Sequence, residues 1–136
     1  MKRFCTLISG ISLIFFLHSC KDKQEDPKPE DPKPEASFQS PKAHDMFDFG
    51  DTVFIRLMAT APKDFHGYGL DIRNALDTSQ VLFAYDKHLH NDTIQVDTFW
   101  VNKVTEHTQA LMSFSAAIDH DGNFLRREVN IHCHPQ

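Results

Sequence analysis

Histidine is the residue type through which this sequence could carry most chemistry. Eight of its nine histidines lie in the last 101 residues, and four of them form two pairs with one residue between the partners, His88-Leu89-His90 and His132-Cys133-His134. On a β-strand, residues i and i+2 lie on one face about 6.5–7 Å apart. Both imidazoles of such a pair can therefore converge on one metal ion, which binds nitrogen ligands at about 2.0–2.1 Å. A pair does not complete a site, because zinc and copper take three or four ligands.

The elements that must position these histidines are β-strands. Apolar and polar residues alternate with period two in several short segments, and no long segment has a helical period. The predicted strands cover residues 52–58, 67–73, 79–85, 94–101, 110–118 and 124–133, with a short additional strand at 37–39. Turn-forming residues separate them, and Asp121-Gly122 is the strongest hairpin signal. The pattern predicts an all-β domain, an antiparallel immunoglobulin-like β-sandwich of about six to seven strands.

The alternation also predicts which side chains are buried. Val53, Ile55 and Leu57 share one face of their segment, and Val81, Phe83 and Tyr85 share one face of theirs. Cys133 continues the apolar face of the last strand, so its thiol is expected to be buried and inert. His132 and His134 continue the opposite face and are expected to be exposed.

Strand direction predicts which histidines meet. If successive strands alternate in direction, the connections alternate between the two ends of the sandwich. One end then collects the first candidate ligand set, His66, His88, His90 and His120, with several aspartates beside it. The other end collects the second set, His44, His107, His132 and His134. Nitrogen donors among carboxylates suit Zn²⁺, Cu²⁺ or Ni²⁺, and zinc or copper is the expected cofactor. Two other interpretations stay open: ordinary surface histidines in polar loops, and a surface charge that titrates near pH 6.5.

The first residues have the pattern of a secretion signal. Lys2 and Arg3 precede an apolar run, residues 7–17, that is too short to span a bilayer. Leu17-His18-Ser19-Cys20 resembles the lipobox of bacterial lipoproteins, with His18 departing from the usual small residue. The resemblance implies a signal peptide over 1–19 and lipidation of Cys20. Residues 21–26 are charged and resemble the export signal that sends lipoproteins of Bacteroidetes-type bacteria to the outer face of the outer membrane.

A proline-rich linker comes next. Residues 25–35 contain a tandem repeat of Asp-Pro-Lys-Pro, and proline disfavours both helix and sheet. An extended segment of fifteen such residues reaches roughly 45 Å at about 3.1 Å per residue. We therefore expect a signal peptide (1–19), a lipidated cysteine with a proline-rich charged linker (20–35) and a β-sandwich domain (36–136). Cys133 is the one thiol left in the domain, so no internal disulfide can form there.

Composition and motifs exclude several classes of function. The formal net charge is −5 over 136 residues, and no basic stripe exists that could bind nucleic acid. The sequence has no phosphate-binding glycine loop, no Gly-x-Ser-x-Gly and no His-Glu-x-x-His, so we expect a protein that is not an enzyme.

Two interpretations of function remain. The chain resembles surface lipoproteins of Bacteroidetes-type bacteria, and its domain is loosely similar to the family called domain of unknown function 4625, which implies an immunoglobulin-like fold. The first interpretation is a lipid-anchored, cell-surface module that binds a transition metal or a metal-bearing ligand. The second is an accessory or adhesive module that binds protein or glycan without metal. Its best candidate contact residues are the aromatic side chains of Phe47, Phe65, Tyr68 and Trp100, although packing in the core is the favoured interpretation of Tyr68 and Trp100.

Overall fold

Eight β-strands and no helix make up residues 32–136, the part of the chain that the computed structural model describes. The strands are β1 (Glu35–Ser40), β2 (Met46–Phe47), β3 (Thr52–Phe65), β4 (Tyr68–Asn74), β5 (Val81–Lys87), β6 (Asn91–Val101), β7 (Thr108–Ala117) and β8 (Phe124–Cys133). The expected signal peptide, the expected lipidation site at Cys20 and most of the expected linker lie outside the described residues. Within residues 32–136 we find no apolar helix long enough to cross a bilayer.

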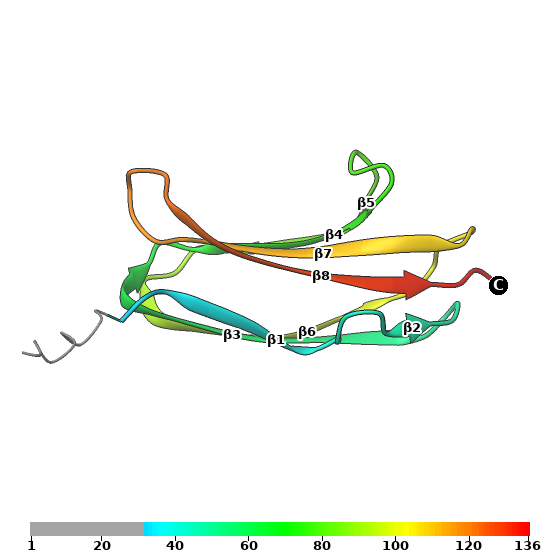
Figure 1. Cartoon of the computed structure of the whole chain (residues 1–136), viewed down its shortest axis with the longest axis horizontal. Helices are drawn as coiled ribbons and strands as arrows, with labels where there is room; N and C mark the ends of the chain where they lie inside the picture. Colours follow the sequence, from blue (N-terminus) through cyan, green and yellow to red (C-terminus); the bar gives the residue numbers. More distant parts are fainter. Residues whose placement is uncertain (1–31) are drawn as a thin grey trace, which may run out of the picture. The chain divides into compact units, whose positions relative to one another are not determined.

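The strands form two sheets, which Figure 1 shows as two layers. One sheet has the order β1-β3-β6, and the other has the order β2-β8-β7-β4-β5. The predicted all-β class is confirmed, and the arrangement is that of a β-sandwich. The expectation of a purely antiparallel arrangement is wrong at β2, which pairs in parallel with β8 through Met46 and Phe47. Two residues are too few to show a period, and for that reason the sequence pattern predicts no strand between residues 39 and 52.

Apolar residues that alternate along the strands fill the space between the layers. Val53, Ile55 and Leu57 of β3 are buried as predicted, and so are Val129 and Ile131 of β8. Because an i, i+2 run of apolar residues lies on one face, each of these two strands contributes one row to this core.

The predicted buried face of β5 is wrong. Val81 is 47% exposed and Tyr85 is 39% exposed, while Phe83 is half-buried. The reason is the position of β5, which is the last strand of its sheet and has a neighbour on one side only. An edge strand can keep a period-two pattern without a second layer covering its apolar face.

Several strands extend beyond their predicted ends. β3 continues to Phe65, seven residues past the predicted end of its segment, and β6 begins at Asn91. The extra residues of β3, Ala59 to Phe65, include Pro62, Lys63 and Asp64, which break the alternation that the sequence pattern relies on. The backbone pairing of β3 with β6 carries on past this irregularity, with Phe65 opposite Asn91.

Candidate metal centre

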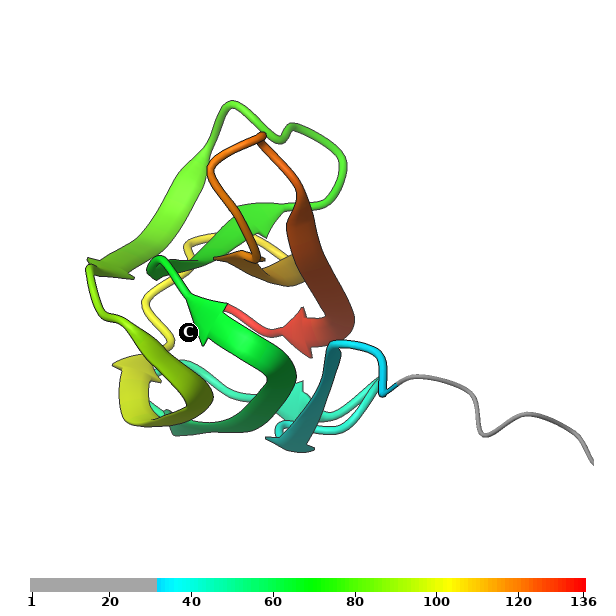
Figure 2. The same ribbon diagram turned by 90° about the vertical axis from the view of Figure 1, so that its left-hand side faces the viewer.

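Four histidines lie together at the end of the sandwich where the chain twice crosses between the layers. His66 lies in the link from β3 to β4, and His88 and His90 lie in the link from β5 to β6. His120 lies in the hairpin between β7 and β8. These links are at the left of Figure 1, opposite the C-terminus, and Figure 2 views the molecule from this end. We call His66, His88, His90 and His120 the histidine cluster.

Ring nitrogens within the cluster approach one another closely. His66 Nδ1 lies 3.2 Å from His90 Nδ1, and His90 Nε2 lies 3.1 Å from His88 Nε2. The ring of His120 packs on that of His66 with 4.0 Å between centroids. Two nitrogens that bind one tetrahedral ion at 2.0–2.1 Å are roughly 3.3 Å apart. Each of the two nitrogen pairs therefore has the separation that a shared ion requires.

The rings do not yet form a complete ligand set. Within residues 32–136, no three His, Cys, Asp or Glu side chains are arranged as a ready-made metal site. His90 explains this, because its Nδ1 faces His66 while its Nε2, on the other side of the ring, faces His88. The cluster is thus two overlapping nitrogen pairs that share His90. A third ligand on one ion requires a ring to turn, which the exposed side chains of His88, His90 and His120 have room to do.

Neutral imidazoles suit the observed contacts. A neutral imidazole has one donor and one acceptor nitrogen, so His90 can donate to one neighbour and accept from the other. The same neutral form is the one that binds metal. As the rings stand, His66, His90 and His88 therefore form a hydrogen-bonded chain of candidate ligands, and His120 joins it through ring packing on His66.

Backbone hydrogen bonds and one glycine hold His66 in place. The His66 N–H donates to the Ala117 carbonyl at 2.9 Å, and the Ala117 N–H donates to the Gly67 carbonyl at 3.0 Å. Gly67 has φ +122°, and a Cβ atom there would lie 3.0 Å from the Lys87 carbonyl oxygen. A residue without a side chain is what lets the β3–β4 link approach the end of β5 and the histidine after it.

The hairpin that carries His120 is closed by Asp119. The Asp119 carboxylate accepts hydrogen bonds from the backbone N–H groups of Asp121 and Asn123 and from the Asn123 side chain. The Asn123 side chain and then its backbone N–H are the main causes that lower the pKa of Asp119. The turn is therefore fixed by a charged side chain one residue before His120.

The pKa of His66 is lowered from its ordinary value of 6.5. The main cause is the partial loss of water around the His66 ring, followed by the positive charges of His120 and His90. The carboxylates of Asp64 and Asp119 oppose the shift.

We expect His66 to titrate below pH 6.5 in an NMR titration of its ring. The substitution His120→Gln should raise the pKa of His66, because it removes one of the two neighbouring charges. Because the pKa of His66 is lower in the folded chain, the unfolded chain binds a proton on His66 more tightly. The contribution of His66 to the free energy of unfolding is therefore complete above pH 6.5, and it is lost as the pH falls through the pKa of the folded state. An unchanged pKa in the variant would contradict the role assigned to His120.

The second candidate set does not form a single cluster. His44 stacks on His132 with 5.9 Å between ring centroids, and His107 meets His134 edge to face at 5.1 Å. His134 Nδ1 also lies 3.2 Å from Asp48 Oδ1. No ring contact or hydrogen bond joins the two pairs among residues 32–136. The expected exposure of His132 and His134 is wrong, since both are half-buried. The reason is the pairing of β8 with β2. Asp45, just before β2, accepts a backbone hydrogen bond from His132, and Phe47 of β2 accepts one from His134.

Cys133 is buried and unpaired, as the strand pattern predicts. Burial raises the pKa of its thiol to about 11. Because the thiolate is the reactive form, we expect almost no labelling by a thiol reagent at pH 8 in the folded protein and complete labelling in denaturant. Mass spectrometry of the labelled chain gives the measurement, and rapid labelling without denaturant would overturn the assignment of Cys133 to the core.

The aromatic contact surface of the second interpretation does not form, and the favoured interpretation of Tyr68 and Trp100, packing against the core, is confirmed. Phe65 and Tyr68 are buried, and Phe47 and Trp100 pack half-buried against the core. Within the described part of the chain, the exposed Phe and Tyr side chains are instead Phe49, Phe54, Tyr85, Phe99 and Phe124. Phe54 and Phe99 occupy outward positions of their strands, where the alternation alone predicts polar residues.

Comparison with protein-family models and with curated protein sequences found no match to this chain. The similarity to the family called domain of unknown function 4625 and to Bacteroidetes-type surface lipoproteins therefore stays a prediction. The chemistry that the domain can perform has to be inferred from its fold and from the geometry of its histidines.

Proposed function

We propose that the chain is a lipid-anchored, surface-exposed lipoprotein whose immunoglobulin-like β-sandwich captures a transition-metal ion at the histidine cluster. The role is binding, without catalysis. The lipobox ending at Cys20 and the charged segment after it support the anchor and the outer-membrane location. The two-layer all-β domain supports the immunoglobulin-like assignment.

The separation of the ring nitrogens is the observation that carries the metal proposal. His90 stands within 3.2 Å of a nitrogen of His66 and within 3.1 Å of a nitrogen of His88. Imidazole nitrogen suits Zn²⁺, Cu²⁺ and Ni²⁺, and an ion held by two or three imidazoles keeps positions open for water or a second ligand. The lowered pKa of His66 favours the neutral, metal-binding form at neutral pH.

Titration calorimetry with Zn²⁺ and Cu²⁺ tests this proposal on the chain from Asp31 onward, a compact unit with its own core. We expect one ion per chain and at least a tenfold loss of affinity in His90→Ala, because His90 belongs to both nitrogen pairs. His107→Ala removes an imidazole at the opposite end and should bind like the unchanged protein. An equal loss in both variants would refute the assignment to the cluster. A flat titration would favour the alternative, an accessory or adhesive module for protein or glycan.

The lipid anchor has its own test. Cells that express the full chain with radiolabelled palmitate should yield a labelled protein, and Cys20→Ser should abolish the label. An unlabelled full chain would refute the anchor and leave the metal proposal standing.

A further inference from the structure

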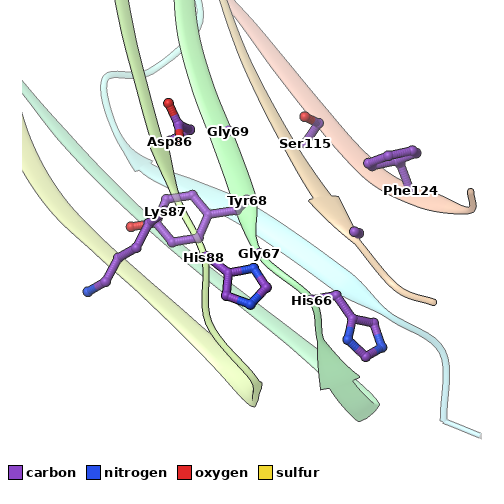
Figure 3. Close-up of a pocket in the computed structure, with 10 residues that line it drawn as sticks. His66, Gly67, Tyr68, Gly69, Asp86, Lys87, His88, Ser115 and Phe124 are labelled. Carbon is purple, nitrogen blue, oxygen red and sulfur yellow. The ribbon is translucent and has the colours of Figure 1, made fainter. Parts of the chain in front are cut away.

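A groove with a floor of small residues runs beside the histidine cluster on the outer face of the five-stranded sheet. Gly67, Gly69, Ser115 and Ala117 line it, and its volume is about 300 Å³. Figure 3 shows Asp86 and His88 on one side of this floor, and Phe124 on the other. The Phe124 side chain is 50% exposed, so it offers apolar surface to a bound molecule.

Strand register places a negative charge, Asp86, in the lining of the groove and a positive charge, Arg126, outside that lining in the same row of residues. Asp86 pairs with Gly69, Gly69 with Ser115, and Ser115 with Arg126. Residues directly opposite each other on neighbouring strands share one face, so these four form a row across β5, β4, β7 and β8. Neighbours in the chain such as Leu70, Ala116 and Leu125 are buried, which puts the row on the outer face.

Both charges are available to a ligand. Asp71, the next outward residue of β4 after Gly69, differs from them because its carboxylate forms an ion pair with Arg73 at 2.7 Å. Among residues 32–136, neither Asp86 nor Arg126 makes an ion pair within 4.0 Å. The Arg126 guanidinium carbon lies 5.8 Å from the centre of the Phe124 ring, so the cation is held beside the apolar wall of the groove.

We propose that this groove binds a short zwitterionic peptide of two or three residues, with its ammonium group at Asp86 and its carboxylate at Arg126. Gly69 and Ser115 leave the space between the two charges free for the peptide backbone, and Phe124 contacts an apolar side chain. The site goes beyond metal capture and does not require a bound ion.

The length of the ligand is set by the strand spacing. Asp86 and Arg126 are three strands apart, and neighbouring strands are separated by about 4.8 Å, so their backbones lie about 14 Å apart. The two side chains cover part of that distance. An extended peptide advances roughly 3.4 Å per residue, so two or three residues bridge the remaining gap.

Trialanine is the probe, titrated by NMR into the chain from Asp31 onward in a buffer with a metal chelator. We expect the amide signals of Gly69 and Ser115 to shift on binding. N-acetylation of the peptide should weaken binding at least tenfold, and so should Asp86→Asn. Because the acetylated peptide has no ammonium group for Asp86 to bind, Asp86→Asn should bind it with the same affinity as the unchanged protein does. At the other end of the peptide, C-terminal amidation and Arg126→Gln should each weaken binding at least tenfold. Arg126→Gln should not weaken the binding of the amidated peptide any further.

Asp92→Asn, on β6 of the other sheet, is the matched control and should bind trialanine like the unchanged protein. Acetylated and amidated peptides that bind as well as trialanine would overturn the proposal, and so would the absence of any shift at millimolar peptide. Because the chelator removes free metal, either failure is independent of the metal titration.

Discussion

Substitution of Asn102 by alanine is expected to lower the free energy of unfolding by about 3–5 kcal/mol, because each buried polar group left without a partner costs roughly 1–3 kcal/mol. Asn102 lies directly after β6 and is completely buried. Its side-chain amide donates to the carbonyls of Phe47 and His134 at 3.0 and 3.1 Å. Its side-chain oxygen accepts a hydrogen bond from the Val104 N–H at 3.2 Å.

These contacts tie three separate segments together. Phe47 belongs to β2, His134 lies just after β8, and Val104 lies in the link from β6 to β7. The backbone of Asn102 adds bonds to Gly50 and Asp51. Alanine removes the side-chain partners of all three segments at once, so no single local adjustment satisfies the groups that remain.

Urea unfolding monitored by circular dichroism measures the effect. Asn74→Ala is the matched control. The Asn74 side chain donates a hydrogen bond through Nδ2 to the exposed side chain of Gln80 and accepts one at Oδ1 from the Leu76 N–H. We expect this control to lose less than about 1 kcal/mol, because water can replace its partners. If Asn102→Ala lowers the free energy of unfolding no more than the control does, the hydrogen bonds of Asn102 do not hold the segments of Phe47, Val104 and His134 together.

Substitution of Gly67 by alanine is the second change with a large expected effect, about 2–4 kcal/mol. A side chain at φ +122° is strained, which by itself costs roughly 1–3 kcal/mol. The added Cβ would also lie 3.0 Å from a backbone oxygen of Lys87, which cannot move without shifting β5. The link that carries His66 must therefore retreat from His88. We expect weaker binding of Zn²⁺ together with the loss of stability.

Gly50→Ala separates the two causes. Gly50 also has a positive φ, +90°, but a Cβ there has open space, with nothing within 4 Å. We expect this control to lose about 1 kcal/mol from backbone strain and to bind metal normally. Equal losses in the two variants would mean that the close approach to Lys87 contributes nothing.

The predictions from sequence succeeded where the physical cause is local. Alternation of apolar and polar residues is a property of a single strand, and it predicted the buried faces of β3 and β8 and both bounds of β8. It failed for β5, because exposure there depends on which strand ends the sheet. It also missed β2, which exists only through its pairing with β8.

The same division applies to the candidate sites. Alternating strand direction is enough to place His66, His88, His90 and His120 at one end of the sandwich, because each connection from β3 to β8 reverses the chain. Only the tertiary structure decided that His90 stands between His66 and His88, and that the histidines of the other end form two separate pairs. The row from Asp86 to Arg126 likewise depends on the order and register of four strands. Side-chain contacts of this kind join residues far apart in the chain, and no local pattern contains them.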